Sequence, residues 1–283
     1  MKKLFALLLC TVMTAAMLTG CDKGEQKVQE GSIENADVTQ EKQEGEKTTF
    51  TVGFDAEFPP YGYMDDSGEY VGFDLSLAQE VCDRNGWELV KQPINWDTKD
   101  MELSSGSIDC IWNGFTINGR EEEYTWSVPY VDNSQVFVVA SDSGIATQAD
   151  LAGKVVAVQA DSSALAALNS EENAAVTESF GSLNQFADYN TAFMDLEAGS
   201  VDAVAMDIGV ANYQIESRDA GKFVILDEYI STEQYGVGFF LGNEELRDQV
   251  QDTLFEMLED GTFAEIAEEW GLSDVVCLSA DAE

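Results

Sequence analysis

Short runs of β-branched and aromatic residues alternate with helical patterns along most of this chain of 283 residues. Helices are predicted near 75–84, 98–104 and 190–198, after 163, up to 218, and over a long amphipathic stretch that Gly261 ends. Because strands that alternate with helices form largely parallel sheets covered by helices, this order predicts an α/β fold. The predicted strands are TFTVGF (49–54), WELVKQ (87–92), IDCIWN (108–113), QVFVVA (135–140), KVVAVQ (154–159), AVTESF (175–180), VDAVAMD (201–207), KFVILD (222–227) and YGVGFFL (235–241).

A faint internal repeat suggests two similarly built halves. LSSGSIDC (103–110) aligns with LEAGSVDA (196–203), and both read as a helix end, a glycine stop and a buried strand. The strands run out at Asn113-Gly114 and at Asp207. Ligands of open α/β sheets bind beyond the carboxyl ends of strands, so two such ends facing each other would form a cleft. The alternative is a chance likeness between two ordinary helix–strand steps.

Charge and composition exclude several classes of function. The chain has 14 Lys and Arg against 54 Asp and Glu, a net charge of −40, which repels phosphate-rich partners and excludes nucleic acid. It contains no histidine, which removes Ser-His and Cys-His nucleophile pairs and His-ligated metals. No Cys-x-x-Cys cluster supports a metal site, and no cofactor is expected. An enzyme built on this chain would have to use carboxylates, Lys, Tyr or Cys.

The N-terminus is typical of an exported protein. Met1-Lys2-Lys3 precedes an apolar run from Leu4 to Leu18, which is too short to span a membrane and fits a signal peptide over residues 1–20. Leu18-Thr19-Gly20-Cys21 resembles a bacterial lipobox, which implies cleavage before Cys21 and a diacylglyceryl group on its thiol. The alternative is a plain secretory signal with a chance cysteine.

The segment that follows is polar. Residues 21–49 are predicted to be a flexible linker because 22–48 contain no aromatic residue and cannot form a core. Beyond Cys10 in the signal and Cys21, the remaining cysteines are Cys82, Cys110 and Cys277, which permit at most one disulfide. Cys82 and Cys110 lie in apolar stretches and are predicted to be buried as small hydrophobic side chains.

Motifs spread over residues 50–272 resemble the bacterial extracellular solute-binding proteins of family 3, the polar amino-acid binding family. The resemblance implies a two-lobed α/β fold of the periplasmic-binding-protein type II, with two crossover hinge segments. The motifs that carry it, besides the segment around Trp96, are VGFDAEFPPYGYMDDSGEYVGFDLSLAQEV (52–81), LSSGSIDCIWNGFTINGRE (103–121), YTWSVPY (124–130), GKVVAVQADSS (153–163), SVDAVAMD (200–207), EQYGVGF (233–239) and DGTFAEIAEEWG (260–271).

From this resemblance we expect residues 50–130 and 235–272 to form lobe 1, residues 131–234 to form lobe 2 with the hinge segments, and 273–283 to be a C-terminal tail. The implied function is that of a substrate-binding lipoprotein of an ABC importer. It would capture a free, polar or basic amino acid between closing lobes and deliver it to a permease with its ATPase.

Such a protein is expected to be a non-enzymatic monomer, tethered to the cell membrane through Cys21 on the extracytoplasmic face. The alternatives are a ligand sensor that signals to a receptor and a carboxylate-based dehydratase on the same fold.

A free amino acid is a zwitterion, so its site needs a fixed cation and a fixed anion. Of four arginines, Arg84 and Arg218 lie near predicted helix ends and Arg247 within one, whereas Arg120 follows a strand end. The family places its carboxylate-binding arginine there, although this loop is one residue shorter than the usual spacing. The alternative role for Arg120 is a surface pair with the adjacent glutamates.

The other site residues are carried over from the family in the same way. Asp207 matches the carboxylate that binds the ligand ammonium, although it could equally cap the next helix. Gly114 and Thr116 are expected near the ligand carboxylate, Asn113 is expected to bind the ligand, and Ser162 and Ser163 are expected to contact the ligand from lobe 2 or to cap a helix. Phe58 and Trp96 match the aromatic walls around the ligand side chain, and Asp55 matches a position that contacts that side chain or shapes the pocket rim. Glu57 and Asp161 would favour a cationic or amide side chain if they faced the cleft.

Overall fold

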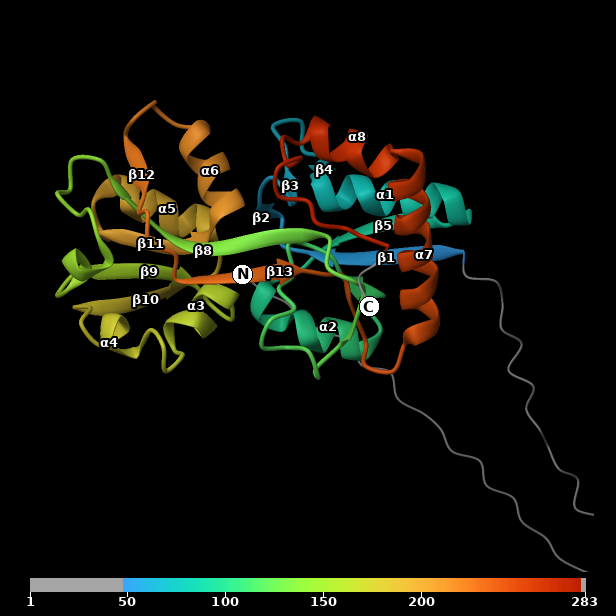
Figure 1. The fold of residues 1–283 in the computed structure, drawn as a ribbon, viewed down its shortest axis with the longest axis horizontal. Coiled ribbons are helices and arrows are strands. Elements are labelled where there is room, and N and C mark those ends of the chain that lie inside the picture. The colour runs from blue at the N-terminus through green and yellow to red at the C-terminus, as the bar shows by residue number, and fades with distance from the viewer. Residues whose placement is uncertain (1–47, 281–283) are drawn as a thin grey trace, which may run out of the picture. The chain divides into compact units, whose positions relative to one another are not determined.

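The structure, a computed structural model, describes residues 48–280. The predicted signal peptide, Cys21 and nearly all of the predicted linker lie outside the described residues. Within 48–280, no helix combines the length and the apolar character needed to cross a membrane. Two sheets, each accompanied by its own helices, dominate this part of the chain, and the long strand β8 runs between them (Figure 1).

The first sheet has the strand order β5-β1-β6-β14-β7. Strand β1 runs parallel to β5 and β6, while β14 returns antiparallel to β6 and β7. Helix α7 packs here through Leu246, Val250 and Leu254, which recur every four residues on one buried face, and Gly261 ends the helix with a φ of 91°. The elements of this lobe are β1 (Thr49–Phe54), α1 (Phe73–Asn85), β5 (Glu88–Pro93), η1 (Trp96–Thr98), α2 (Lys99–Ser105), β6 (Cys110–Ile111), β7 (Thr125–Trp126), β14 (Gly238–Phe239), α7 (Glu244–Asp260) and α8 (Thr262–Glu269), with the small sheet β2 (Glu57–Phe58), β3 (Gly62–Met64) and β4 (Tyr70–Val71).

The second sheet has the order β10-β9-β11-β8-β12, with β13 also paired to β8. Strands β9, β10 and β11 are parallel, and β11 is buried at every position, as expected of a central strand covered on both faces. The elements of this lobe are β8 (Val131–Ala140), η2 (Gln148–Leu151), β9 (Val155–Gln159), α3 (Ser163–Leu168), α4 (Ala174–Thr177), β10 (Ser182–Phe186), α5 (Tyr189–Ala198), β11 (Ala203–Asp207), α6 (Ile208–Glu216), β12 (Phe223–Ile225) and β13 (Ser231–Tyr235).

The chain passes between the two lobes through paired strands. The beginning of β8 and the whole of β13 are antiparallel, with Val131 opposite Tyr235 and Gln135 opposite Ser231. The segment after α8 adds to this pair, since the Cys277 N–H donates to the Tyr130 carbonyl at 3.0 Å. The crossing is therefore a hydrogen-bonded ribbon, and opening the lobes must bend it as a unit.

One predicted strand is wrong. The first three residues of the run AVTESF (175–180) lie in helix α4 (Ala174–Thr177), and the strand of this region is β10, which begins at Ser182. Alanines have high helix propensity, and the N–H of Glu178 donates to the Ala174 carbonyl at 2.8 Å. The prediction for Cys82 and Cys110 is confirmed, because both side chains are fully buried.

Candidate functional site

A small cavity lies where the carboxyl ends of strands from both sheets meet. Its volume is about 10 Å³, room for about one water molecule, so a free amino acid fits only if the walls separate and close again around it. The first lobe supplies Phe58, Trp96, Gly114, Thr116 and Arg120, and the second supplies Gln159, Ser162, Ser163 and Asp207. Among the side chains predicted for the site, Asp55 and Asn113 do not line this cavity.

Arg120 forms one end of the cavity from the loop between β6 and β7. Its guanidinium donates to the Thr116 carbonyl at 3.3 Å and, across the cleft, to the Asp161 carbonyl at 3.4 Å. It lies 5.3 Å from the centroid of the Phe115 ring. Within residues 48–280 no carboxylate pairs with Arg120, the adjacent glutamates included, so its charge is available to an anionic ligand group.

Asp207 forms the other end at the last position of β11, with only 2% of its surface exposed. Its Oδ1 accepts hydrogen bonds from Asn133 Nδ2 at 2.8 Å, Gln135 Nε2 at 2.7 Å and the Tyr235 hydroxyl at 2.6 Å. Burial, followed by the negative charge of Glu233, raises the pKa of Asp207 to about 7. It begins α6 but makes no side-chain cap hydrogen bond there.

Glu233 is a second buried carboxylate at this end, and the sequence reasoning missed it. It is 7% exposed, and its Oε1 accepts from the Thr116 hydroxyl at 2.8 Å and the Ser163 hydroxyl at 3.2 Å. Asn133 Nδ2 and Gln135 Nε2 donate to this oxygen as well, at 2.8 and 2.7 Å. Its only sequence signal was the EQYGVGF motif (233–239), where nothing distinguishes it from a surface glutamate.

Other aromatic rings pack against the two predicted aromatic walls, Phe58 and Trp96. Phe58 packs between the rings of Tyr61 and Tyr189, both with centroids 5.9 Å away, and Trp96 meets the Phe115 ring edge-on at 5.5 Å. Gly114 has a φ of 56°, and a Cβ there would lie 2.8 Å from Phe58. The position therefore requires glycine for its backbone conformation and for space.

The N–H of Gly114 is already used by a buried carboxylate. It donates to Asp74 Oδ2 at 2.6 Å, and the Tyr130 hydroxyl donates to Asp74 Oδ1 at 2.8 Å. Burial raises the pKa of Asp74 to about 7. Asp74 thus ties the loop under the cavity to the start of the crossing strands, a role that no sequence pattern indicated.

Asp55 and Asn113 lie beside the cavity. Asn113 Oδ1 accepts from the Asp55 N–H at 2.9 Å, and Asp55 Oδ2 accepts from Gln159 Nε2, which reaches across from the second lobe, at 2.6 Å. Asp55 lines a neighbouring pocket of about 300 Å³ together with Glu57, Trp96 and Asp188. Burial, and to a smaller extent the charges of Asp188 and Glu57, raise the pKa of Asp55 to about 6.

The two serines start helix α3. Ser162 Oγ accepts from the Leu165 N–H at 3.1 Å, as an N-cap does, and also donates to the Gln159 carbonyl. Ser163 Oγ donates to Glu233 and accepts from Gln135 Nε2 at 2.9 Å. Both hydroxyls line the cavity while making these structural contacts, so they are available to a ligand only through their remaining lone pairs or by exchanging partners.

An ion pair joins the lobes at the Arg120 end. Lys99 Nζ contacts Asp161 Oδ2, and Lys99 is 2% exposed although it is a lysine. Asp161 has a φ of 56°, a left-handed conformation that a non-glycine residue adopts at some cost. Asp161 therefore points toward the first lobe. No sequence pattern indicated that Lys99 is buried, because a lysine at the start of a helix is usually solvent-exposed.

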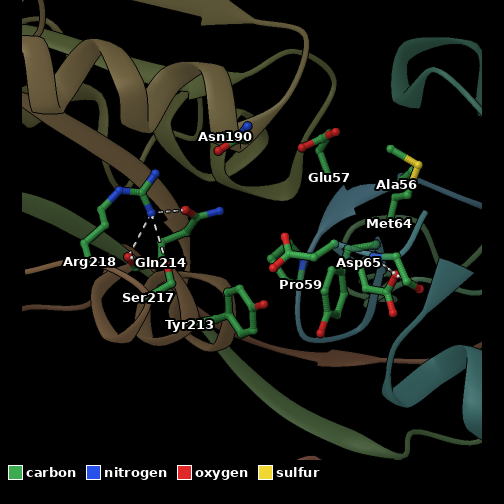
Figure 2. Close-up of a pocket in the computed structure, with 13 residues that line it drawn as sticks. Ala56, Glu57, Pro59, Met64, Asp65, Asn190, Tyr213, Gln214, Ser217 and Arg218 are labelled. Atoms are coloured by element: carbon green, nitrogen blue, oxygen red, sulfur yellow. Dashed lines mark hydrogen bonds between the residues drawn. The ribbon is translucent and has the colours of Figure 1, made fainter. Parts of the chain in front are cut away.

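A larger pocket of about 780 Å³ lies at another junction of the two lobes, beside β2, β3 and α6 (Figure 2). Two of its charged groups already have protein partners. Arg218 donates to the Gln214 carbonyl at 2.9 Å, and Asp65 accepts from the Ser67 N–H at 2.9 Å. Among residues 48–280, no group of three or more Cys, Asp or Glu side chains is placed to hold a metal ion.

This chain resembles known proteins in both sequence and fold. The model of the bacterial extracellular solute-binding proteins, family 3, matches residues 50–273. The L-cystine-binding protein TcyJ of Escherichia coli K12 is 30% identical over 81% of this chain and 85% of its own length, and the ABC transporter arginine-binding protein 1 of the same strain is 26% identical over 80% and 90%. A crystal structure of an ABC uptake transporter substrate-binding protein from Streptococcus pneumoniae with bound histidine superposes with a TM-score of 0.77, at 33% identity over 81% of this chain and 95% of that one. The likeness in fold agrees with the predicted two-lobed type II architecture.

Proposed function

Because this chain belongs to the bacterial extracellular solute-binding proteins of family 3, we propose that it captures a free amino acid between its two lobes and delivers it to an ABC importer. The observation that carries this proposal is the placement of Arg120 and Asp207 on the same small cavity, one from each lobe. A guanidinium with no carboxylate partner among the described residues suits the ligand carboxylate, and the buried Asp207 suits its ammonium group.

Closure is the mechanism that this geometry supports. The cavity is far smaller than an amino acid, and its two charged ends belong to different lobes, so the ligand must enter an opened form. It would bind one lobe first and gain the second set of contacts only when the crossing strands bend back. Such a ligand shifts the population toward the closed form by its extra affinity for that form.

The surroundings of Asp55 favour a basic or polar side chain. Asp55, Glu57 and Asp188 line one pocket next to Trp96, and within 48–280 none of them forms an ion pair with a lysine or arginine. Three acidic groups without a cation attract a positively charged group at the far end of a ligand side chain. The named relatives bind cystine, arginine and histidine, so membership of the family does not identify the ligand. The residues of this pocket would determine which amino acid binds.

The remaining parts of the proposal concern where the protein acts. We infer that a lipid on Cys21 holds it as a monomer on the extracytoplasmic face of the cell membrane, where the closed form meets a permease and its ATPase. Cys21 lies outside the described residues, so this part rests on the sequence pattern Leu18-Thr19-Gly20-Cys21.

A thermal-shift screen tests the amino-acid proposal directly. The purified chain is heated with each of the twenty standard amino acids, with cystine and with ornithine. A ligand present at 100 times its Kd stabilises the folded state by about 2.7 kcal/mol, and we expect the largest shift from a basic amino acid or cystine. A set of unchanged melting temperatures would contradict the proposal, and turnover of a carboxylic acid substrate by the same preparation would favour a dehydratase.

A further inference from the structure

At the Asp207 end of the cavity, one buried carboxylate lines the cavity and a second lies behind it, where one would balance the charge of a ligand. Asp207 and Glu233 are 2% and 7% exposed. Neither forms an ion pair with a lysine or arginine in the part of the chain that the structure describes. Two desolvated negative charges side by side without a cation are costly, and proteins relieve that cost by binding a proton or a cation.

The two carboxylates are joined by shared donors. Asn133 Nδ2 and Gln135 Nε2 each donate to both Asp207 Oδ1 and Glu233 Oε1, at 2.7 to 2.8 Å. Both amide nitrogens are therefore committed to the pair, and this orientation leaves the buried oxygens Asn133 Oδ1 and Gln135 Oε1 without a donor. Two buried amide oxygens thus stay without hydrogen bonds while the amide nitrogens donate to the carboxylates, which indicates that the carboxylates determine the orientation of both amides.

The charged and titratable neighbours do not supply the missing cation. The phenols of Tyr61, Tyr189 and Tyr235 face the pair from the first lobe, from α5 and from β13, and burial raises the pKa of each, so they remain neutral. Asp74 also lies near Tyr61 and adds negative charge. Arg120 lines the same cavity, and a neighbouring pocket together with Glu233, but its guanidinium donates to carbonyl oxygens and forms no ion pair with either carboxylate within residues 48–280.

We propose that Asp207, beside the buried Glu233, holds a proton in the ligand-free protein, and that the ammonium group of the arriving amino acid displaces this proton. Asp207 then passes from neutral to negatively charged, the ammonium supplies the compensating positive charge, and the released proton goes to water or buffer. Glu233 is thus a positioning residue that makes ligand capture depend on pH. The inference rests on the proposed function, since it needs an ammonium ligand at Asp207.

The geometry gives this exchange a direct route. Asp207 lines the cavity, and Thr116 and Ser163, which also line it, both donate to Glu233 Oε1, so Glu233 lies immediately behind the cavity wall. The raised pKa of Asp207 agrees with a proton held there near neutral pH. Because the exchange releases a proton, acid must weaken ligand binding, by about tenfold for each pH unit below the pKa of Asp207, which is about 7.

Calorimetry measures the exchange on the intact exported chain. L-Arginine and L-glutamine serve as probes because their side chains do not titrate between pH 5 and 8. Each is titrated at about pH 6 in phosphate and in imidazole, which differ in enthalpy of ionisation. We expect the binding enthalpy to differ between the buffers by the amount that corresponds to release of about one proton.

Variants locate the source of the proton. Glu233→Gln should cut the released proton count to less than half and flatten the pH profile of the Kd, while Glu233→Asp should retain both. Glu245→Gln, an exposed carboxylate on α7, is the matched control and should behave as the parent protein.

The outcomes separate the two proposals. Binding heat without any buffer dependence in the parent protein overturns the proton exchange and leaves the proposed function intact. Unchanged release in Glu233→Gln also overturns it, because the proton then comes from elsewhere, for example from Asp55. If no amino acid gives heat, the proposed function fails, and the exchange fails with it.

Discussion

The two ends of the cavity are built in different ways. Asp207 stands on β11 and is held by side chains of β8 and β13, all in one sheet, so its surroundings exist before the lobes meet. Arg120 stands on a loop of the other lobe, and one of its two hydrogen bonds crosses the cleft to Asp161. Asp207 therefore has its hydrogen-bond partners before the lobes close, whereas Arg120 gains one of its two only on closure.

The largest effect is expected on ligand affinity when the positive charge of Arg120 is removed. Arg120→Ala leaves the ligand carboxylate desolvated without a partner, which we expect to weaken binding by about 3 kcal/mol, more than a hundredfold in Kd. The free energy of unfolding should change by less than about 0.5 kcal/mol, because Arg120 bonds only carbonyl oxygens. Calorimetry and chemical denaturation measure the two quantities.

The control for that variant is Arg247→Ala, which removes an arginine that contacts Asp248 and the Trp126 carbonyl away from the cavity. Its ligand affinity should match that of the parent protein. An unchanged ligand affinity in Arg120→Ala would show that Arg120 does not bind the ligand carboxylate. The proposed difference between the two ends of the cavity would then be wrong.

The next effect is on stability, and it comes from the buried carboxylates in and beside the cavity. The folded-state pKa values of Asp207 and Asp74 are about 7 and that of Asp55 is about 6, all raised from 3.8 chiefly by burial. Between about pH 4 and 7 the folded chain therefore binds more protons than the unfolded chain, and its stability must fall as the pH rises through this window. We expect the melting temperature of the ligand-free protein to drop by at least 2–4 °C between about pH 5 and 8, equivalent to about 1 kcal/mol.

Asp207→Asn sharpens that test, because the amide carries no charge to desolvate. We expect this variant to be more stable than the parent protein at about pH 8 and to show a shallower pH profile, while its amino-acid affinity falls. A melting temperature that rises from pH 5 to 8 in the parent protein would mean that the buried carboxylates are ionised and well compensated when folded.

The smallest effect is expected from the contact that joins the lobes at the Arg120 end. Lys99→Met removes the ion pair with Asp161 but keeps an apolar stem over Trp96, so the closed form should lose about 1 kcal/mol or less relative to the open form. Small-angle X-ray scattering should show a larger radius of gyration for the ligand-free variant, and the Kd should rise up to about fivefold.

Lys154→Met, which removes the contact with Asp202 inside the second lobe, is the matched control and should leave the radius of gyration unchanged. Asp161→Asn should reproduce Lys99→Met, and the double variant should add nothing further. Additive effects would mean that the two side chains act separately.

The sequence alone determined the α/β class, the long helix that Gly261 ends, and the burial of Cys82 and Cys110. The first two follow from hydrophobic periodicity and from a glycine at the helix end, and the third follows from the apolar neighbours of the two cysteines. Local propensity failed at 174–177, where either a helix or a strand was compatible with the residues. Arg120 and Asp207 could be named because each follows a strand end and resembles a family motif.

Only the tertiary structure decided which charges stand together. Glu233, Asp74 and Lys99 are buried by contacts with residues far along the chain, at Thr116, Gly114 and Asp161 respectively. A carboxylate or an ammonium group has no local pattern that tells whether water or protein will surround it. Burial and charge pairing are properties of the assembled lobes, and for that reason the sequence named both ends of the cavity but not the second carboxylate behind one of them.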